Sequence, residues 1–369
     1  MKAAVLRQPG QPMTIEDVDL AEPRAGEVEV RVQAAGVCHS DLHYMTGDLP
    51  TRLPIVLGHE GAGVVERVGP GVTRVAPGDP VVLMWRPRCG HCAFCSSGRP
   101  ALCTSAKKQV STGGLLDGTS RLSADGETVH HFLGVSCFAE RAVVAEESVI
   151  RIPQGTPPRV AALVGCAVVT GVGAVLNVLG AGAGRSVLVM GAGGVGLSTV
   201  IGADLVGAYP VIVADVAPDK LDLARRLGAT HTVTVGGDVA VDDAVRDIVP
   251  DGVEWAFDAV GKAETLAAAM ASLRTGGTTV AIGLGRAGAT VEVPINDLVQ
   301  REKRLVGSLY GSSNTVTQVP RLLELYAAGR LDLDALVGET YPLDAINDAY
   351  DALAAGAVGR AVIEPGVAA

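Results

Sequence analysis

Residues 186–208, SVLVMGAGGVGLSTVIGADLVGA, join a short apolar run, a glycine-rich turn and a second apolar run long enough for a helix. The first run is typical of a buried strand, and the repeated glycines mark a turn. Another strand follows in YPVIVADV and another helix in PDKLDLARRLGA, and the alternation continues through VEWAFDAV, ETLAAAMASL and TTVAIGL. Alternation of strands and helices at this spacing predicts an α/β fold with a doubly wound parallel sheet.

The glycine turn has the spacing of a dinucleotide-binding loop, with Gly191, Gly193 and Gly196 in register. The first glycine permits a tight turn, the second lets the backbone approach a pyrophosphate, and the third allows close helix–strand packing. Free N–H groups at the start of the next helix would face the phosphates. The predicted cofactor contacts in this turn are Gly191, Gly193, Gly194, Val195 and Gly196. The alternative is a glycine-rich helix start that binds nothing.

Asp215 lies 19 residues after Gly196, at the end of the next predicted strand. A carboxylate at this place can bind both ribose hydroxyls of an adenosine and would repel a 2′-phosphate. We therefore expect NAD rather than NADP. The alternative is an ordinary surface aspartate.

The first 150 residues have a different sequence pattern. Short segments such as EVEVRVQAAGV, GAGVVERVG and DPVVLM are apolar or alternating, with Gly, Pro and Asp between them. This pattern predicts a β-rich, partly open barrel. From about residue 310 the chain returns to a mixture of helix and strand, and PRLLELYAAGRL has the periodicity of an amphipathic helix.

The chain has 369 residues, enough for two domains, and a net charge of −10 without a basic run. We therefore expect neither nucleic acid nor an anionic membrane as a partner. The first residues, MKAAVLRQPG, lack the apolar core of a secretion signal, so we expect a cytoplasmic protein. Residues 160–184 carry no charge and are long enough to span a bilayer. Their glycines and the strand that follows favour a buried helix between the domains.

Four of the seven cysteines lie in the fifteen residues CGHCAFCSSGRPALC: Cys89, Cys92, Cys95 and Cys103. Disulfides are uncommon in a reducing cytoplasm. Four thiolates at short spacing can surround one tetrahedral zinc ion, and such a closed shell is structural. An iron–sulfur cluster or a redox pair remains an alternative. His91 could compete as a ligand, but four sulfurs already fill the shell.

A second candidate zinc site draws on residues far apart in the sequence. A catalytic zinc needs three protein ligands and one open position, and Cys38, His59 and Cys166 fit that count. Glu60 could tune the metal, and Asp41 could orient His59. Spacing alone does not join Cys166 to Cys38, and a buried cysteine or histidine is more often a packing residue.

The segments GVCHSD, LGHEGAGVVERVGPGV, CGHCAFCSSGRPALC, GCAVVTGVGAV and VLVMGAGGVG, in this order, resemble the zinc-dependent medium-chain alcohol dehydrogenases over essentially the whole chain. The long segment between Cys103 and Cys166 is similar to the branch shared by liver-type and class III enzymes. The resemblance implies a GroES-like catalytic domain (1–167 and 310–369) with a structural zinc lobe at about 87–105. It also implies a Rossmann NAD domain (168–309), two Zn²⁺ per chain and a homodimer joined through coenzyme-domain strands.

The resemblance also implies roles for single residues. It assigns the catalytic zinc to Cys38, His59 and Cys166, with Glu60 beside them, and the structural zinc to Cys89, Cys92, Cys95 and Cys103. Cys137 matches no ligand and is interpreted as packing. The implied catalytic and cofactor contacts are Ser40 for the alcohol hydroxyl, His43 for proton relay, His39 and Arg360 for the pyrophosphate, and Asp215 and Lys220 for the adenosine ribose.

The implied substrate channel is apolar and includes Trp85, Leu133 and Leu284, which suits primary aliphatic or aryl alcohols and their aldehydes. Class III enzymes bind the glutathione amine with acidic residues, but here the corresponding loop TGDLPTRLP holds only Asp48 and adds Arg52. Thiol-adduct-dependent formaldehyde oxidation is therefore the alternative reading. A catalytically silent binding protein is a further one. The segments HHFLGVSCFAE and YGSSNTVTQVPRLLELYAAGRL resemble a bacterial subgroup that holds its nicotinamide cofactor tightly.

Overall fold

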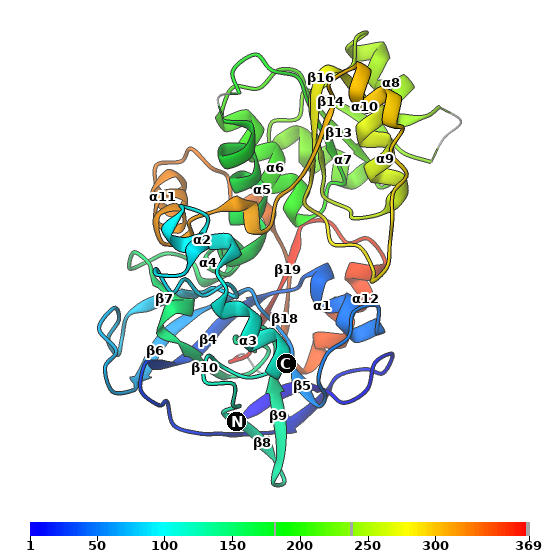
Figure 1. Cartoon of the computed structure of the whole chain (residues 1–369). Coiled ribbons are helices and arrows are strands. Elements are labelled where there is room, and N and C mark those ends of the chain that lie inside the picture. Colours follow the sequence, from blue (N-terminus) through cyan, green and yellow to red (C-terminus); the bar gives the residue numbers. More distant parts are fainter. Residues whose placement is uncertain (181, 237–238, 367–369) are drawn as a thin grey trace. The chain divides into compact units, whose positions relative to one another are not determined.

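The computed structural model describes residues 1–180, 182–236 and 239–366, and the chain forms two compact units (Figure 1). Unit 1 comprises Met1–Cys166, Asn314–Glu324 and Val337–Ala369, and unit 2 comprises Ala167–Ser313 and Leu325–Leu336. The segment Leu325–Leu336, which the predicted boundaries place in the catalytic domain, packs with unit 2. The separate functions of the two units stay a prediction at this point.

Unit 1 is rich in strands, as the short apolar segments predict. Its described residues form one sheet in the order β2-β1-β5-β9-β8-β3 and another in the order β11-β7-β6-β4-β19-β18, with β10 paired to β4. The strands are β1 (Lys2–Leu6), β2 (Thr14–Asp17), β3 (Asp19–Leu20), β4 (Glu27–Gly36), β5 (Ile55–Val56), β6 (Gly61–Val68), β7 (Pro80–Leu83), β8 (Leu122–Ala124), β9 (Glu127–His131), β10 (Arg141–Ala145), β11 (Val149–Arg151), β18 (Val337–Pro342) and β19 (Arg360–Glu364).

The helices of unit 1 are short. They are α1 (His39–Thr46), α2 (Ala93–Ser96), α3 (Ser105–Thr112), α4 (Pro158–Leu163) and α12 (Ile346–Ala354), with 3₁₀ turns η1 (Pro100–Leu102), η2 (Glu146–Ser148) and η7 (Leu343–Ala345). Helix α11 (Thr315–Ala327) begins in unit 1 and ends in unit 2. The first helix follows the long buried strand β4, and its N-cap is Cys38, whose sulfur accepts from the Ser40 N–H. It ends at Gly47, which takes the left-handed conformation with φ 85°.

Unit 2 contains a parallel sheet in the order β14-β13-β12-β15-β16-β17 among the described residues. Numbered within the unit, this is 3-2-1-4-5-6, the order of a dinucleotide-binding sheet. The strands are β12 (Val187–Met190), β13 (Val211–Asp215), β14 (His231–Thr234), β15 (Val253–Asp258), β16 (Leu273–Ala281) and β17 (Arg304–Gly307). The doubly wound sheet predicted from residues 186–208 is therefore confirmed, and the order reverses beside β12, directly before the glycine turn.

Helices precede and connect these strands along the chain (Figure 1). They are α5 (Val169–Ala174), α6 (Gly194–Leu205), α7 (Pro218–Arg226), α8 (Val241–Ile248), α9 (Ala263–Ala271) and α10 (Ile295–Gln300), with 3₁₀ turns η5 (Tyr310–Ser312) and η6 (Asp334–Leu336). One core of the unit forms where Leu188, Ile212 and Ala256 meet Val245 and Ala269.

The apolar run noted in the sequence is a continuous helical segment, Pro158–Leu179. Its length and hydropathy would allow it to cross a membrane, but 83% of its most apolar stretch is buried within the protein. This burial agrees with the predicted core helix. The segment includes π-helical turns η3 (Val164–Val168) and η4 (Val175–Leu179), and Cys166 lies in the first of them. Such turns are frequent at functional sites.

Candidate metal centres and nucleotide site

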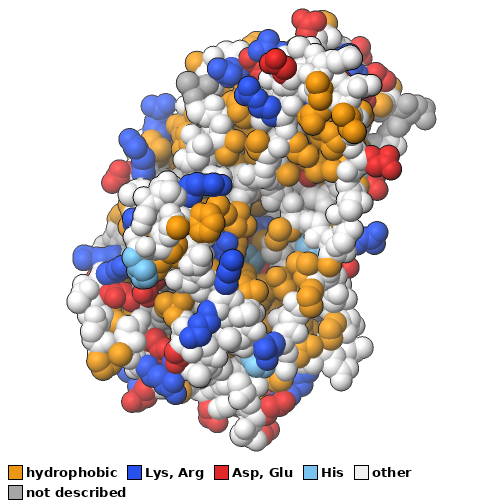
Figure 2. Space-filling model, in the orientation of Figure 1, with side chains coloured by type: hydrophobic (Ala, Val, Ile, Leu, Met, Phe, Trp, Pro, Cys, Tyr) orange, Lys and Arg blue, Asp and Glu red, His pale blue; other side chains and the backbone are white. Residues whose placement is uncertain are grey.

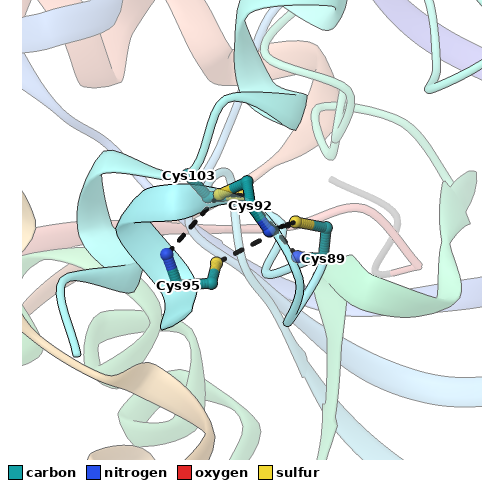
Figure 3. Close-up of side chains that lie close together, drawn as sticks. All are labelled: Cys89, Cys92, Cys95 and Cys103. Carbon is teal, nitrogen blue, oxygen red and sulfur yellow. Dashed lines mark hydrogen bonds between the residues drawn. The ribbon is translucent and has the colours of Figure 1, made fainter. Parts of the chain in front are cut away.

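The four cysteines of the predicted zinc lobe converge (Figure 3). Their sulfur atoms all lie within 4.8 Å of one another, with 4.0 Å between Cys89 and Cys95 and 3.9 Å between Cys92 and Cys103. Tetrahedral zinc with Zn–S bonds of about 2.3 Å separates its sulfurs by about 3.8 Å, so the donor set fits this ion. A disulfide would need an S–S distance of about 2 Å. All the described cysteines are free thiols.

Backbone N–H groups support this lobe. The N–H of Cys92 lies 3.4 Å from the Cys89 sulfur, and the N–H of Cys95 lies 3.5 Å from the Cys92 sulfur. The latter contact lowers the pKa of the Cys92 thiol to about 5, whereas burial raises the pKa of Cys95 to about 12. The lobe therefore mixes a ready thiolate with a thiol that must release its proton when a metal binds.

The second cluster is buried. One ligand atom each from Cys38, His59 and Glu60 lie within 4.8 Å of one another. Cys166 completes the group, because its hydrogen bond with Cys38 lowers the pKa of Cys38 well below its usual value and raises its own well above. The structure thus joins Cys166 to Cys38, which spacing in the sequence could not do. Two cysteines and one histidine are a donor set that suits zinc with an open position.

Asp41 fixes the orientation of His59. Its Oδ1 lies 3.2 Å from His59 Nδ1 and also accepts from the Gly58 N–H at 3.1 Å. With Nδ1 engaged by a fully buried carboxylate, Nε2 is left to face the cluster as a metal ligand. Burial alone would lower the pKa of His59, but Asp41 and Cys38 raise it well above its usual value.

Glu60 is paired with Arg360 from the distant strand β19. Arg360 Nε donates to Glu60 Oε2 at 3.1 Å, and Arg360 Nη2 donates to Oε1. Burial raises the pKa of Glu60, although the guanidinium opposes that shift. A Cβ at Gly36 would lie 2.3 Å from Glu60 Oε2, so only glycine leaves room for this pair. The predicted pyrophosphate contact of Arg360 stays a prediction; two of its nitrogens already bind Glu60.

Helix α1 carries three predicted site residues. The Ser40 N–H lies 3.4 Å from the Cys38 sulfur, so Ser40 stands beside the cluster. His43 Nδ1 lies 3.2 Å from Asp48 Oδ2, and its side chain is 25% exposed. His39, the first residue of the helix, is exposed. The geometry alone does not test the catalytic and cofactor roles of these three residues, which stay predictions.

Two aromatic rings lie near His59. The Trp85 ring centroid lies 6.3 Å and the Phe132 ring centroid 5.7 Å from that of His59. Leu133 packs against the core of unit 1, whereas Leu284 lies in unit 2 and is half exposed. Phe132 was missed by the sequence reasoning; its position directly before Leu133 in HHFLGVSCFAE was the available signal.

The glycine turn has the features that the sequence predicts. Gly191 has φ 89°, and a Cβ at Gly196 would lie 1.8 Å from the Gly191 carbonyl oxygen. A Cβ at Gly193, in contrast, would meet no atom within 4 Å, so its backbone faces open space. Helix α6 has no side-chain cap at its start. This leaves backbone N–H groups for a phosphate.

Asp215 ends β13 and binds the turn. Its Oδ2 accepts from the Ala192 N–H at 2.6 Å, and its Oδ1 accepts from the Ala217 N–H at 2.9 Å. The carboxylate is therefore fixed at the carboxyl edge of the sheet, where a ribose would lie. Lys220 follows in the first turn of α7.

Comparisons with known proteins agree with this geometry. Residues 24–154 match the alcohol dehydrogenase GroES-like domain, and residues 194–326 match the zinc-binding dehydrogenase domain. The class-3 alcohol dehydrogenase of Drosophila melanogaster is 37% identical over 98% of this chain and 97% of its own. The S-(hydroxymethyl)glutathione dehydrogenase of Escherichia coli is 40% identical over 98% of this chain and 99% of its own.

A solved structure has the same fold. The benzyl alcohol dehydrogenase of Acinetobacter calcoaceticus superposes with a TM-score of 0.92 at 33% identity, over 98% of both chains. The predicted combination of a GroES-like domain and a Rossmann domain is confirmed, as is the prediction of Zn²⁺ and NAD as cofactors. The chain therefore belongs to the zinc-dependent medium-chain alcohol dehydrogenase family, with class III-like relatives, and is an NAD-dependent alcohol oxidoreductase.

Proposed function

We propose that this enzyme interconverts primary aliphatic or aryl alcohols and their aldehydes at the buried centre of Cys38, His59 and Cys166. The observation that carries the proposal is the convergence of Cys38 and His59, with Cys166 hydrogen-bonded to Cys38 and His59 Nδ1 held by Asp41 at 3.2 Å. Zn²⁺ held by these side chains would act as a Lewis acid toward the alcohol oxygen, and NAD would accept the hydride. The four-cysteine lobe holds the structural zinc in this proposal.

The protein's own residues orient the centre and move the proton. Asp41 holds Nδ1 of His59, so that a metal would bind at Nε2. Glu60 and Arg360 balance each other's charge beside the thiols. Ser40 would take the hydroxyl proton of the alcohol, and His43 would pass it to solvent, which its partial exposure allows. Unit 1 is accordingly the catalytic domain and unit 2 the coenzyme domain.

The cofactor contacts follow the glycine turn. The backbone of Gly191, Gly193, Gly194, Val195 and Gly196 would hold the pyrophosphate at the start of α6. Asp215 and Lys220 would bind the adenosine ribose, and His39 and Arg360 would add positive charge near the phosphates. The fixed Asp215 carboxylate supports NAD over NADP, because it would repel a 2′-phosphate.

An aryl or medium-length aliphatic alcohol suits the surroundings of His59. Trp85 and Phe132 place ring edges near it, and Leu133 follows. A solved relative with this fold is a benzyl alcohol dehydrogenase. We place Leu284 in the same channel as a prediction from the family resemblance.

The second candidate is oxidation of a formaldehyde–thiol adduct, which the name of the Escherichia coli relative favours. The loop after α1 argues against a glutathione adduct. Its one acid, Asp48, already accepts from Thr46 and contacts His43, and Arg52 Nε donates to the Ser111 carbonyl oxygen. An ammonium group would have to displace these contacts.

We also propose a homodimer in the cytoplasm. Strand β17 is the edge of the parallel sheet, and Leu305 on it is exposed. Ile295 and Val299 of α10 are 76% and 68% exposed, and hydrophobic side chains gather over α9 and α10 in Figure 2. A sheet edge that pairs with no further strand among the described residues, beside exposed apolar side chains, is suited to a second copy. Sedimentation should show a dimer, and a monomer at working concentration would contradict this.

The decisive experiment measures NADH formation with primary, secondary and aryl alcohols, and with formaldehyde in the presence and absence of glutathione. We expect turnover of benzyl alcohol and medium-length primary alcohols without thiol. Activity only with formaldehyde and glutathione would establish the alternative. If no substrate yields free NADH, heat-denatured protein should be assayed for released cofactor, because permanent retention of the nicotinamide would hide turnover. Failure of both tests would indicate a catalytically silent protein.

A further inference from the structure

We propose that a pocket on unit 1, beside the four-cysteine lobe, binds a compact oxyanion of the phosphate or dicarboxylate class. Its volume is about 470 Å³, and it is lined by Arg74, Arg88, Gly90, Val149, Ile150, Arg151 and Val316. No acidic side chain is among these described residues. The pocket is therefore strongly positive, although the whole chain carries a net charge of −10.

The guanidinium of Arg88 is the central observation. Its Nε is buried and has no hydrogen-bond partner within the described part of the chain. No carboxylate among the described residues lies within ion-pair distance of Arg88 or Arg74. A buried donor without a partner costs free energy, and such groups are rare in folded proteins. An oxyanion in the pocket would supply the missing acceptor.

Two acids near the pocket are already engaged. Asp79 contacts Arg151 Nε at 3.3 Å and accepts from the Ala76 N–H at 2.9 Å. Glu146 accepts from the Thr73 and Arg74 N–H groups, each at 2.6 Å. Arg151 therefore has side-chain N–H donors that its single contact with Asp79 does not use. The guanidinium of Arg74 makes no ion pair within the described part of the chain, so all its donors can face a ligand. Guanidinium groups converging from three segments match the planar oxygens of phosphate and carboxylate.

The pocket lies where a bound ligand would connect separate segments of unit 1. Arg88 and Gly90 flank Cys89, whereas Val149–Arg151 form strand β11 and Val316 lies in α11. A bound oxyanion would tie the start of the lobe to the sheet. This inference is independent of the proposed catalytic roles, because none of the lining residues belongs to the Cys38 centre or to the glycine turn.

The test is calorimetric titration of the zinc-loaded, full-length protein with inorganic phosphate and, separately, with malonate. Ionic strength is held constant with chloride. We expect saturable binding with one site per chain, and Arg88→Gln and Arg74→Gln should each weaken it by about tenfold or more. The control is Arg31→Gln, an arginine that is exposed like Arg74 but pairs with Glu66 at 3.0 Å, and it should bind like the wild type. Tighter binding of phosphate or of malonate identifies the ligand class.

Three results would overturn the proposal. The first is the absence of saturable binding of either anion by the wild-type protein. The second is unchanged affinity in both Arg88→Gln and Arg74→Gln. The third is loss of zinc from Arg88→Gln with phosphate affinity unchanged, because Arg88 would then serve only to balance the charge of the thiolates. Zinc content is measured for each variant, and Arg74→Gln decides the matter if Arg88→Gln fails to fold.

Discussion

The four-cysteine lobe and the buried Cys38 centre are built in opposite ways. The lobe takes all its donors from fifteen consecutive residues and leaves Cys89 and Cys92 partly exposed. The centre collects donors from the N-cap of α1, from the residues before β6 and from the π-helical turn at Cys166, all of them buried. The lobe is stabilised by backbone N–H groups, whereas the centre is surrounded by charged side chains.

In the proposed function, this difference separates a metal that holds the fold from a metal that performs chemistry. Four equivalent sulfurs near tetrahedral spacing leave no position for a substrate. The two cysteines and one histidine of the centre, with the Glu60–Arg360 pair nearby, leave one. The comparison therefore predicts loss of turnover when the centre is damaged and loss of stability when the lobe is damaged.

The largest effect is expected at the centre. Cys38→Ser should lower kcat for benzyl alcohol by about a thousandfold or more, because Lewis-acid activation contributes several kcal/mol to the transition state. Zinc per chain should fall from two to one while the thermal transition changes little. The measurement is steady-state NADH formation together with metal analysis. Full activity with one zinc lost would end the proposed mechanism.

The matched change in the lobe is Cys92→Ser. It should also remove one zinc per chain, and it should lower the free energy of unfolding by roughly 4 kcal/mol or more, because a structural metal site contributes directly to folding. The fraction that stays folded should retain most of its kcat. Thermal unfolding and activity per folded chain are measured on the same sample. A thousandfold loss of kcat without destabilisation would reverse the roles of the two clusters.

Local motifs were predictable from the sequence, and distant assemblies were not. The lobe and the glycine turn lie within short stretches, so spacing and residue type define their geometry directly. Cys166 joined the centre only through the family resemblance, because its position depends on how a buried helical segment packs. The Glu60–Arg360 pair was not foreseen, since its members lie 300 residues apart.

The same reasoning explains the surroundings of the centre. Phe132 directly follows the last residue of β9, and its ring lies near that of His59. No periodicity in the sequence predicts this contact. The arginine pocket draws on three separated segments and was equally invisible. Leu284 was predicted in a channel with Trp85, but it belongs to unit 2, and its place in that channel stays a prediction.

The charge pair of the centre gives the next effect in size. Arg360→Met should lower the free energy of unfolding by about 3 kcal/mol, because it leaves Glu60 buried without its partner. The double variant Glu60→Gln/Arg360→Met should recover part of this loss, as expected for two groups in contact. Urea unfolding of the single and double variants measures the coupling. NAD affinity of the folded Arg360→Met protein tests the pyrophosphate role separately, and equal stability of all three proteins would contradict the pairing.

The smallest effect concerns His131, which stands beside Phe132 and is 1% exposed. Its Nε2 accepts from the Arg121 N–H at 3.2 Å, and its buried Nδ1 has no hydrogen-bond partner in the described residues. Burial lowers the pKa of His131 to about 3. Below the ordinary histidine pKa of about 6.5, the unfolded chain therefore binds a proton that the folded chain refuses. Stability is complete above that pH and falls as the pH falls toward 3.

As the pH falls from 7.5 to 5.5, His131 alone should lower the free energy of unfolding by about 1.4 kcal/mol. His131→Gln keeps an acceptor for Arg121 but cannot be charged, so its unfolding free energy should vary less with pH by that amount. The comparison with the wild type removes the contribution of thiols and metal, which both proteins share. His130→Gln, one residue earlier and half-buried, is the control and should follow the wild type. Parallel pH profiles for wild type and His131→Gln would show that water reaches this side of the centre. The four-cysteine lobe and the Cys38 centre would then differ less in their access to water than the burial of the side chains at the centre implies.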